Sequence, residues 1–467
     1  MIPLWQRSAS ELLEGYRLGK WSPVEAIDSV LARLREINPS LNAVIALNPD
    51  ARKAAERSRL RYMAGKPLSQ LDGIPISIKD NLLMAGLPAT WGCRALKDHQ
   101  PEMDELPVGR LRAQGAVLFG KTNVPEFTLE GYTDNALFGT TRNPWNTELT
   151  PGGSSGGAVA AVAAGIGPLA LCTDGGGSIR RPSAHTGLVG LKPSIGAIAR
   201  GNGFPSLLLD FEVVGPVGRN VADVKMMFDA LCSGQPEGNR SRCPPAQERR
   251  PVRVLYVQTL SDSPVDPSIR SATDEAAAVL AWMGCEVETR PLALELTEIN
   301  ETWPEIGQIG LAHLFDLFPA WRAQTSTKYL DMARSGEGIP ASRLWACLER
   351  VQALRQAVGV LFETWDFILT PTTAALAWPA AEAYPVVIDD QAVGPRGHAI
   401  FTGWVNVAGN AAISLPAVPA DNGLPIGIQL IGPWGSEQGL LALAARYEAT
   451  QPWATRFGRL WCNASDN

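Results

Sequence analysis

Two serines in this sequence stand in surroundings that suit nucleophilic catalysis. Ser154 lies in a glycine-rich run, 152–157 (Gly-Gly-Ser-Ser-Gly-Gly), and Ser178 follows three consecutive glycines. Those glycines are Gly175, Gly176 and Gly177. Consecutive glycines let several backbone N–H groups point at one spot, as an oxyanion hole requires to stabilise developing negative charge. If the helix and strand between the two loops fold back on each other, the two serines come within reach of one another. The alternative is that the two glycine runs are unrelated turns with no shared site.

A lysine at the end of an apolar strand is the candidate base. In the run 73–81 (Gly-Ile-Pro-Ile-Ser-Ile-Lys-Asp-Asn), alternation puts three isoleucines on one face and Lys79 on the other. Such a lysine usually extends to the surface. If Lys79 is buried instead, desolvation disfavours the ammonium form and lowers the pKa. A neutral lysine would then activate a serine in a chain that has only 4 histidines.

Two further motifs predict other chemistry. The run 115–122 matches GxxxxGK[ST], the pattern of a phosphate-binding loop, with Lys121 in the lysine position. Its four middle residues are apolar and strand-forming, which favours a buried strand. The run 152–157 also matches GxSxG, with either Ser154 or Ser155 as a nucleophile for a Ser-His-Asp hydrolase. A loop at 143–151 stands where that motif needs a strand, which weighs against it.

The pattern of apolar residues predicts the elements that position these motifs. Strands are expected at 74–78, 116–119 and 169–172, with helices at 106–113 and 155–164. This alternation indicates an α/β sheet covered by helices on both faces, in one domain. Within it we expect four parts: N-terminal helices at 1–65, a core at 70–230, a variable and largely helical part at 235–365, and further core strands and a helix at 366–450. The stretch 234–250 is expected to be a surface connection.

Composition narrows the class of protein. The 467 residues carry a net charge of −6, which gives no electrostatic signature for nucleic acid or an anionic membrane. The uncharged stretch 156–172 is rich in Ala and Gly, so we expect a buried helix and strand there rather than a membrane span. No signal peptide is expected, and 7 scattered cysteines without a CxxC suit reduced thiols in the cytoplasm. The isolated histidines argue against a metal site.

The ordered combination of these motifs resembles the amidase signature family. The resemblance implies a mixed sheet of about eleven strands, as in that family, and a catalytic triad formed by Ser178, Ser154 and Lys79. It also implies that Ser154 follows a cis peptide bond, and that amides at Gly175, Gly176 and Gly177 stabilise the tetrahedral intermediate. The substrate would be a small amide hydrolysed without a cofactor or metal, and a homodimer is the expected oligomer.

The resemblance extends to supporting residues and leaves alternatives open. Asp174 and Arg180 are expected to brace the catalytic loop, and Ser155 to assist through hydrogen bonds. Ala399 stands near where the A-type subunits of glutamine-using amidotransferases carry an acidic residue, which weighs against glutamine as the substrate. Tryptophans suit a pocket for an aryl or alkyl amide: Trp303, Trp321, Trp345 and Trp365 of the variable part, and Trp404. The alternatives are an inactive binding or scaffold member and an amidotransferase A-type subunit.

Overall fold

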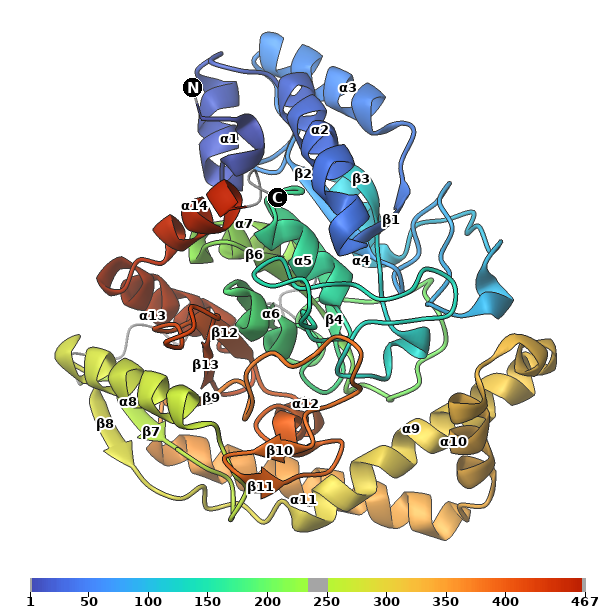
Figure 1. Cartoon of the computed structure of the whole chain (residues 1–467), viewed down its shortest axis with the longest axis vertical. Coiled ribbons are helices and arrows are strands. Elements are labelled where there is room, and N and C mark those ends of the chain that lie inside the picture. Colours follow the sequence, from blue (N-terminus) through green and yellow to red (C-terminus); the bar gives the residue numbers. More distant parts are fainter. Residues whose placement is uncertain (1, 234–250, 464–467) are drawn as a thin grey trace.

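The computed structural model describes residues 2–233 and 251–463 of the chain (Figure 1). The expected surface connection at 234–250 lies outside the described residues. Eleven strands form one mixed sheet. In order across the sheet they are β1 (Val44–Leu47), β3 (Val117–Thr122), β2 (Pro75–Lys79), β4 (Leu169–Asp174), β6 (Val213–Gly218), β5 (Val189–Lys192), β12 (Ala412–Pro416), β13 (Gly427–Ile431), β9 (Phe367–Pro371), β7 (Arg253–Tyr256) and β8 (Glu286–Thr289).

Helices surround the sheet, as Figure 1 shows. They are α1 (Ala9–Arg17), α2 (Pro23–Leu41), α3 (Ala51–Met63), α4 (Leu106–Ala113), α5 (Gly156–Ala163), α6 (Arg180–Thr186), α7 (Val221–Cys232), α8 (Pro267–Trp282), α9 (Thr297–Leu317), α10 (Thr327–Glu337), α11 (Ala341–Thr364), α12 (Gly403–Ala408), α13 (Glu437–Thr450) and α14 (Ala454–Asn463). Short 3-10 turns lie at η1 (Leu4–Gln6), η2 (Arg94–Leu96), η3 (Glu126–Thr128), η5 (Pro319–Gln324) and η6 (Gly397–Ala399), and β10 (Val387–Ile388) pairs with β11 (Gln391–Ala392).

The sheet confirms the predicted α/β class, and strands from near both ends of the chain share it. The strands expected at 74–78, 116–119 and 169–172 are β2, β3 and β4, and β2 runs parallel to both neighbours. The strands β1, β5, β6 and β8 were not predicted. β5 and β6 contain glycine or proline, which are depleted in strands, and β1 and β8 are short strands at the two edges of the sheet. Helices α9, α10 and α11 make up most of the second half of the variable part at 235–365, which was expected to be largely helical.

The apolar stretch 156–172 forms α5 and β4, as predicted. Every residue of α5 is buried, and the helix consists of Gly, Ala and Val. A side chain at Gly157 would meet the backbone N of Asn123 at 2.4 Å, so only glycine lets the helix approach the end of β3 this closely. Within the part of the chain that the structure describes, no helix is long and apolar enough to cross a membrane.

The sheet brings the predicted motifs to one edge. The parallel pairing of β2 and β4 puts their carboxyl ends together, with Ile78 opposite Leu171. Lys79 is the last residue of β2, and Asp174 is the last residue of β4. The loop that carries Ser178 therefore begins beside Lys79, where parallel strands of an α/β sheet usually hold their ligands.

Candidate active site

Lys79 is fully buried and contacts one of the two candidate serines. Its Nζ lies 2.9 Å from Ser154 Oγ, 2.9 Å from Thr173 Oγ1 and 3.1 Å from the Thr173 carbonyl oxygen. Burial disfavours the ammonium form and lowers the pKa of Lys79 to about 8, although the carboxylate of Glu212 acts in the opposite direction. A neutral Nζ has a lone pair that can accept the Ser154 proton. The side chain is therefore equipped to act as a base near neutral pH.

The glycine-rich loop before α5 is tied to the loop that carries Ser178. The Gly153–Ser154 peptide bond is cis, as the resemblance implied. The Ser155 N–H donates to the Ser178 carbonyl oxygen at 3.3 Å, and the Ser155 hydroxyl donates to the Thr173 carbonyl oxygen at 3.3 Å. Within the described residues the Ser178 hydroxyl makes no hydrogen bond. The structure thus joins Lys79 to Ser154 directly, whereas the contact between Ser154 and Ser178 stays a prediction.

Asp174 and Arg180 form the expected ion pair behind this loop. Both side chains are fully buried, and Arg180 Nη2 lies 2.9 Å from Asp174 Oδ1. Arg180 also donates to Gln429 Oε1 at 2.6 Å and to Asn406 Oδ1 at 2.5 Å. Asn406 Nδ2 in turn donates to Asp174 Oδ1 at 2.9 Å. The guanidinium and these donors hold the pKa of Asp174 well below its usual range, despite the opposing effect of burial.

The expectation for Gly177 needs correction. Its N–H donates to Asp174 Oδ1 at 2.7 Å, so this amide braces the loop and is not free for an oxyanion. Gly177 also has a φ of 114°, a backbone conformation that favours glycine. Within the described residues the amides of Gly175 and Gly176 have no hydrogen-bond partner. These two glycines therefore remain the predicted oxyanion donors.

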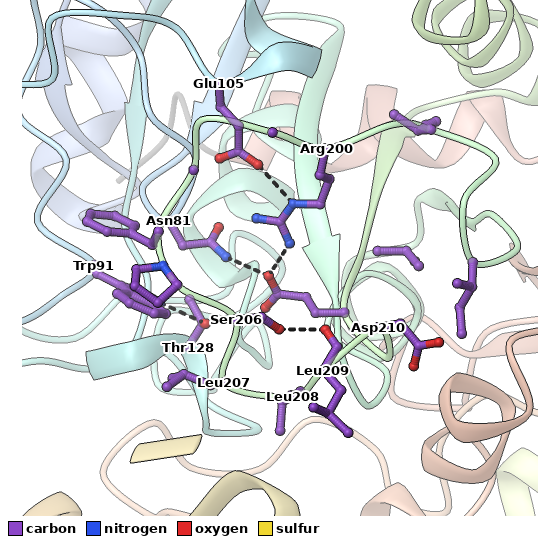
Figure 2. A pocket seen from close by; sticks show the side chains of 18 of the residues that line it. Asn81, Trp91, Glu105, Thr128, Arg200, Ser206, Leu207, Leu208, Leu209 and Asp210 are labelled. Carbon is purple, nitrogen blue, oxygen red and sulfur yellow. Dashed lines mark hydrogen bonds and ion pairs between the residues drawn. The ribbon is translucent and has the colours of Figure 1, made fainter. Parts of the chain in front are cut away.

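A cavity of about 520 Å³ is lined by Asn81 and Leu208, among others (Figure 2). A side chain on Gly175 would meet Leu208, which lines the cavity, at 2.7 Å. Asn81 joins the cavity to the base, because its Nδ2 donates to Thr173 Oγ1 at 2.9 Å and to Glu212 Oε1 at 3.4 Å. Arg200 then bridges Glu212 and Glu105, with N–O distances of 2.7 and 2.8 Å.

Part of the wall of this cavity is aromatic. Trp91 and Phe127 line it, and the Trp91 ring N–H donates to Thr128 Oγ1 at 3.1 Å. Trp91 and the polar residues Glu105, Arg200 and Glu212, which also line the cavity, were not predicted from the sequence, because no motif links them. The only signal for Asn81 was its place two residues after Lys79.

The tryptophans expected in a pocket have different positions. The Trp303 ring packs on Gly176, where an added Cβ would lie 3.0 Å from its Cζ2 atom. Trp404 is buried in α12, whereas Trp345 is 66% exposed. Trp321 stacks on Phe318. The guanidinium of Arg253 lies over the Trp365 ring. Of these five tryptophans, only Trp303 packs against one of the loop's glycines.

The two competing motifs do not form the sites they predict. Lys121 lies in β3, fully buried, with its Nζ 3.1 Å from Asp80 Oδ1 and 2.7 Å from the Leu82 carbonyl oxygen. It is therefore a strand residue with an internal partner, as expected. Across residues 2–233 and 251–463, no histidine hydrogen-bonds to Ser154, Ser155 or Ser178, and no group of three potential ligands is placed to hold a metal ion.

Comparison with known proteins identifies the family. The family model for amidases matches residues 25–441. The chain is 34% identical to the A-type subunit of a glutamyl-tRNA(Gln) amidotransferase of Symbiobacterium thermophilum, over 94% of this chain and 96% of the relative. It is 32% identical to an acylamidase of Rhodococcus erythropolis, over 96% of each.

Solved structures agree with this assignment. A bacterial aryl acylamidase of the amidase signature family superposes with a TM-score of 0.88 at 28% identity, covering 97% of this chain and 98% of that one. A 6-aminohexanoate cyclic dimer hydrolase superposes with a TM-score of 0.88 at 29% identity, covering 98% and 100%. The resemblance inferred from the motifs is confirmed: the chain belongs to the amidase signature family of amide-hydrolysing enzymes.

Proposed function

We propose that this chain hydrolyses a carboxamide to a carboxylate and ammonia or an amine, through an acyl-enzyme on Ser178. The observation that carries the proposal is the contact of 2.9 Å between the buried Lys79 Nζ and Ser154 Oγ. Such a contact pairs a base of lowered pKa with a hydroxyl that can pass a proton onward. The loop tie between Ser155 and Ser178 supports the second half of the path.

In the proposed reaction, neutral Lys79 accepts the Ser154 proton while Ser154 Oγ takes the proton of Ser178. Ser178 Oγ attacks the amide carbonyl carbon, and the amides of Gly175 and Gly176 stabilise the oxyanion. The proton then returns through Ser154 to the amide nitrogen, the C–N bond breaks, and ammonia or the amine leaves. Water, deprotonated through the same pair, attacks the ester and releases the carboxylate and Ser178.

An aryl or alkyl amide is the proposed substrate. Trp91 and Phe127 line the cavity next to Gly175, and Trp303 covers Gly176. Flat or extended apolar groups bury well on such surfaces. The similar proteins include an aryl acylamidase and an acylamidase, which supports the same class.

The amidotransferase alternative follows from the relative of that name. Ala399 is buried and carries no charge, whereas the family resemblance places an acidic residue for the amine of glutamine near this position. We therefore expect glutamine to be a poor substrate, and glutamine belongs in any panel of test amides.

We further propose that the chain functions as a single domain and as a homodimer in the cytoplasm. Strands from residues 44–47 to 427–431 share one sheet, which supports the single domain. The described cysteines are free, and most are buried, which suits a reducing compartment. Light scattering of the purified protein and fractionation of cells test the oligomer and the location.

Covalent labelling tests the proposed reaction. We expect a fluorophosphonate to give a single adduct on Ser178 by intact mass and peptide mapping, absent in Ser178→Ala and much slower in Lys79→Ala. Ammonia release from an amide panel should be lost in the same variants. An adduct on Ser154 or Ser155 that survives Lys79→Ala would refute the mechanism. The absence of any adduct and of any hydrolysis would favour an inactive binding protein.

A further inference from the structure

A second cavity, of about 540 Å³, adjoins the cavity of about 520 Å³ that Figure 2 shows. We call the first the outer cavity and the second the inner cavity. Gly203, Phe204 and Pro205 line both, so this short segment is the wall that the two cavities share. The outer cavity opens to solvent, because the exposed side chains of Lys97 and Asp98 lie at its rim.

The Phe204 ring has an aromatic partner in each cavity. It stacks on Trp91, which lines the inner cavity, with ring centroids 4.7 Å apart and planes 13° apart. Its centroid lies 5.7 Å from that of His99, which lines the outer cavity. Trp91 in turn meets Phe127 edge-on, with centroids 5.6 Å apart. Phe204 is therefore the last of a row of rings that begins at Phe127 in the inner cavity.

The outer cavity has an apolar surface of its own. Phe318 and Trp321 line it, and their rings stack with centroids 4.3 Å apart and planes 8° apart. Trp321 belongs to η5 between α9 and α10, and Phe318 is 37% exposed. An apolar group that reached this pair would leave water, which is favourable in proportion to the area buried. The Phe204 wall is what separates such a surface from the inner cavity.

The segment 202–205 is held at its ends rather than along its length. Arg200 pairs with Glu105 before the segment, and Asp210 pairs with Arg355 after it. Within the part of the chain that the structure describes, residues 202–205 themselves make no hydrogen bond. Removing the aromatic ring from this segment should therefore open the wall while the chain on either side stays in place.

We propose that Phe204 sets the length of the acyl group that the enzyme prefers, by closing the inner cavity toward the outer one. This inference rests on the proposed function, because it takes the inner cavity to hold the acyl group of the amide. A chain long enough to meet the Phe204 ring must turn toward solvent, where Leu209 of the same loop is 49% exposed. Methylene groups beyond that point stay in water and add no binding energy. The wild type therefore favours short aryl or alkyl acyl groups.

A series of ω-phenylalkanamides, from 2-phenylacetamide to 8-phenyloctanamide, tests the proposal on the full chain. All of them release ammonia, so only the acyl group differs. We expect kcat/KM of the wild type to stop rising at a short member of the series. In Phe204→Ala it should continue to rise. The ratio of kcat/KM for 8-phenyloctanamide to that for 2-phenylacetamide should increase about 10 to 100 times, the range for burying one phenyl group.

Three further variants separate the wall from other effects. Phe204→Trp keeps an aromatic ring in place and should keep the wild-type ratio. Phe318→Ala should leave the ratio of the wild type unchanged but lower that of Phe204→Ala, because only the opened wall lets the acyl group reach the outer cavity. Phe362→Ala is the matched control, since Phe362 of α11 lines a separate cavity, and it should change the ratio in neither background. Both amides are assayed on one sample, so the ratio does not depend on the fraction of folded enzyme.

Labelling of Ser178 gives a second measurement that needs no amide hydrolysis. The rate of labelling by a dodecyl fluorophosphonate, relative to an ethyl one, should also rise in Phe204→Ala. A ratio that Phe204→Ala leaves unchanged for the amides, or for the probes where no amide is hydrolysed, would overturn the role of Phe204 and leave the amidase reaction standing. A gain that Phe318→Ala does not reduce would also overturn it. If no amide reacts and neither probe labels Ser178, the proposed function itself fails.

Discussion

Replacing Glu212 by glutamine tests whether the charge behind Lys79 sets the pH at which the enzyme works. Three hydrogen bonds connect the two residues: Lys79 to Thr173 at 2.9 Å, Asn81 to Thr173 at 2.9 Å, and Asn81 to Glu212 at 3.4 Å. Glu212 raises the pKa of Lys79 against the larger effect of burial, which brings it down to about 8. Removing the negative charge should therefore lower the pKa further.

The size of the effect follows from that connection. The three hydrogen bonds place Glu212 Oε1 no more than about 9 Å from Lys79 Nζ. At this separation a unit charge contributes between about 0.5 kcal/mol in a water-like dielectric and about 2 kcal/mol in a protein-like one. These energies correspond to about 0.4 and 1.5 pH units. In the variant Arg200 keeps Glu105 but loses Glu212, so its charge is less compensated and acts on Lys79 in the same direction.

The assay is kcat/KM for an uncharged amide between about pH 5.5 and 9.5, because this ratio reports the base in the free enzyme. Lys79 must be neutral to act, so activity should rise with pH to a midpoint near 8 in the wild type. In Glu212→Gln the midpoint should move down, with higher relative activity at pH 6 to 7. Asp210→Asn is the control, because Asp210 lines the same cavity but pairs with Arg355. A Glu212→Gln midpoint that stays in place or moves up would refute this reasoning.

Three other substitutions give distinct expected outcomes. Lys79→Met should lower kcat/KM by about 10² to 10⁴, because the variant lacks the general base. The free energy of unfolding, measured by urea denaturation, should change little. Activity within tenfold of wild type would show that Lys79 is not the base. Asp174→Asn leaves Arg180 buried without its counter-charge, so urea denaturation should show a loss of about 3 to 5 kcal/mol in unfolding free energy; unchanged stability would contradict the bracing role. Lys121→Met should destabilise the fold by a similar amount, because Asp80 loses its partner. Calorimetry should detect no binding of millimolar nucleotide to the wild type, and binding that Lys121→Met abolishes would revive the phosphate-loop hypothesis.

Much of the architecture around the site was predictable from local patterns. Ser22 and Pro23 signal a helix start, and α2 begins at Pro23 with the Ser22 side chain capping Glu25. The alternation at 74–78 and the apolar run at 116–119 became adjacent parallel strands. These signals are readable because they depend on residues within one turn or one strand of each other.

The partners of each site residue were not predictable, because they come from distant parts of the chain. Arg180 meets Asn406 and Gln429, more than two hundred residues away. Glu212 and Arg200 reach Lys79 only through Asn81 and a cavity that several loops enclose. No local spacing encodes such contacts. The role of Gly177 also changed, because its amide faces Asp174.

The residue types and their spacing along the chain already indicate which chemistry this protein can perform. Two serines beside flexible glycines, a lysine at the end of an apolar strand and a lack of histidines predict a serine nucleophile with a lysine base. The tertiary structure decided whether those groups can react. Folding buries Lys79, which lowers its pKa, and places Ser154 within 2.9 Å of it. It also pairs Arg180 with Asp174 in the interior. Desolvation and charge pairing depend on everything that surrounds a side chain in space, and the order of residues along the chain does not specify that until the sheet has formed.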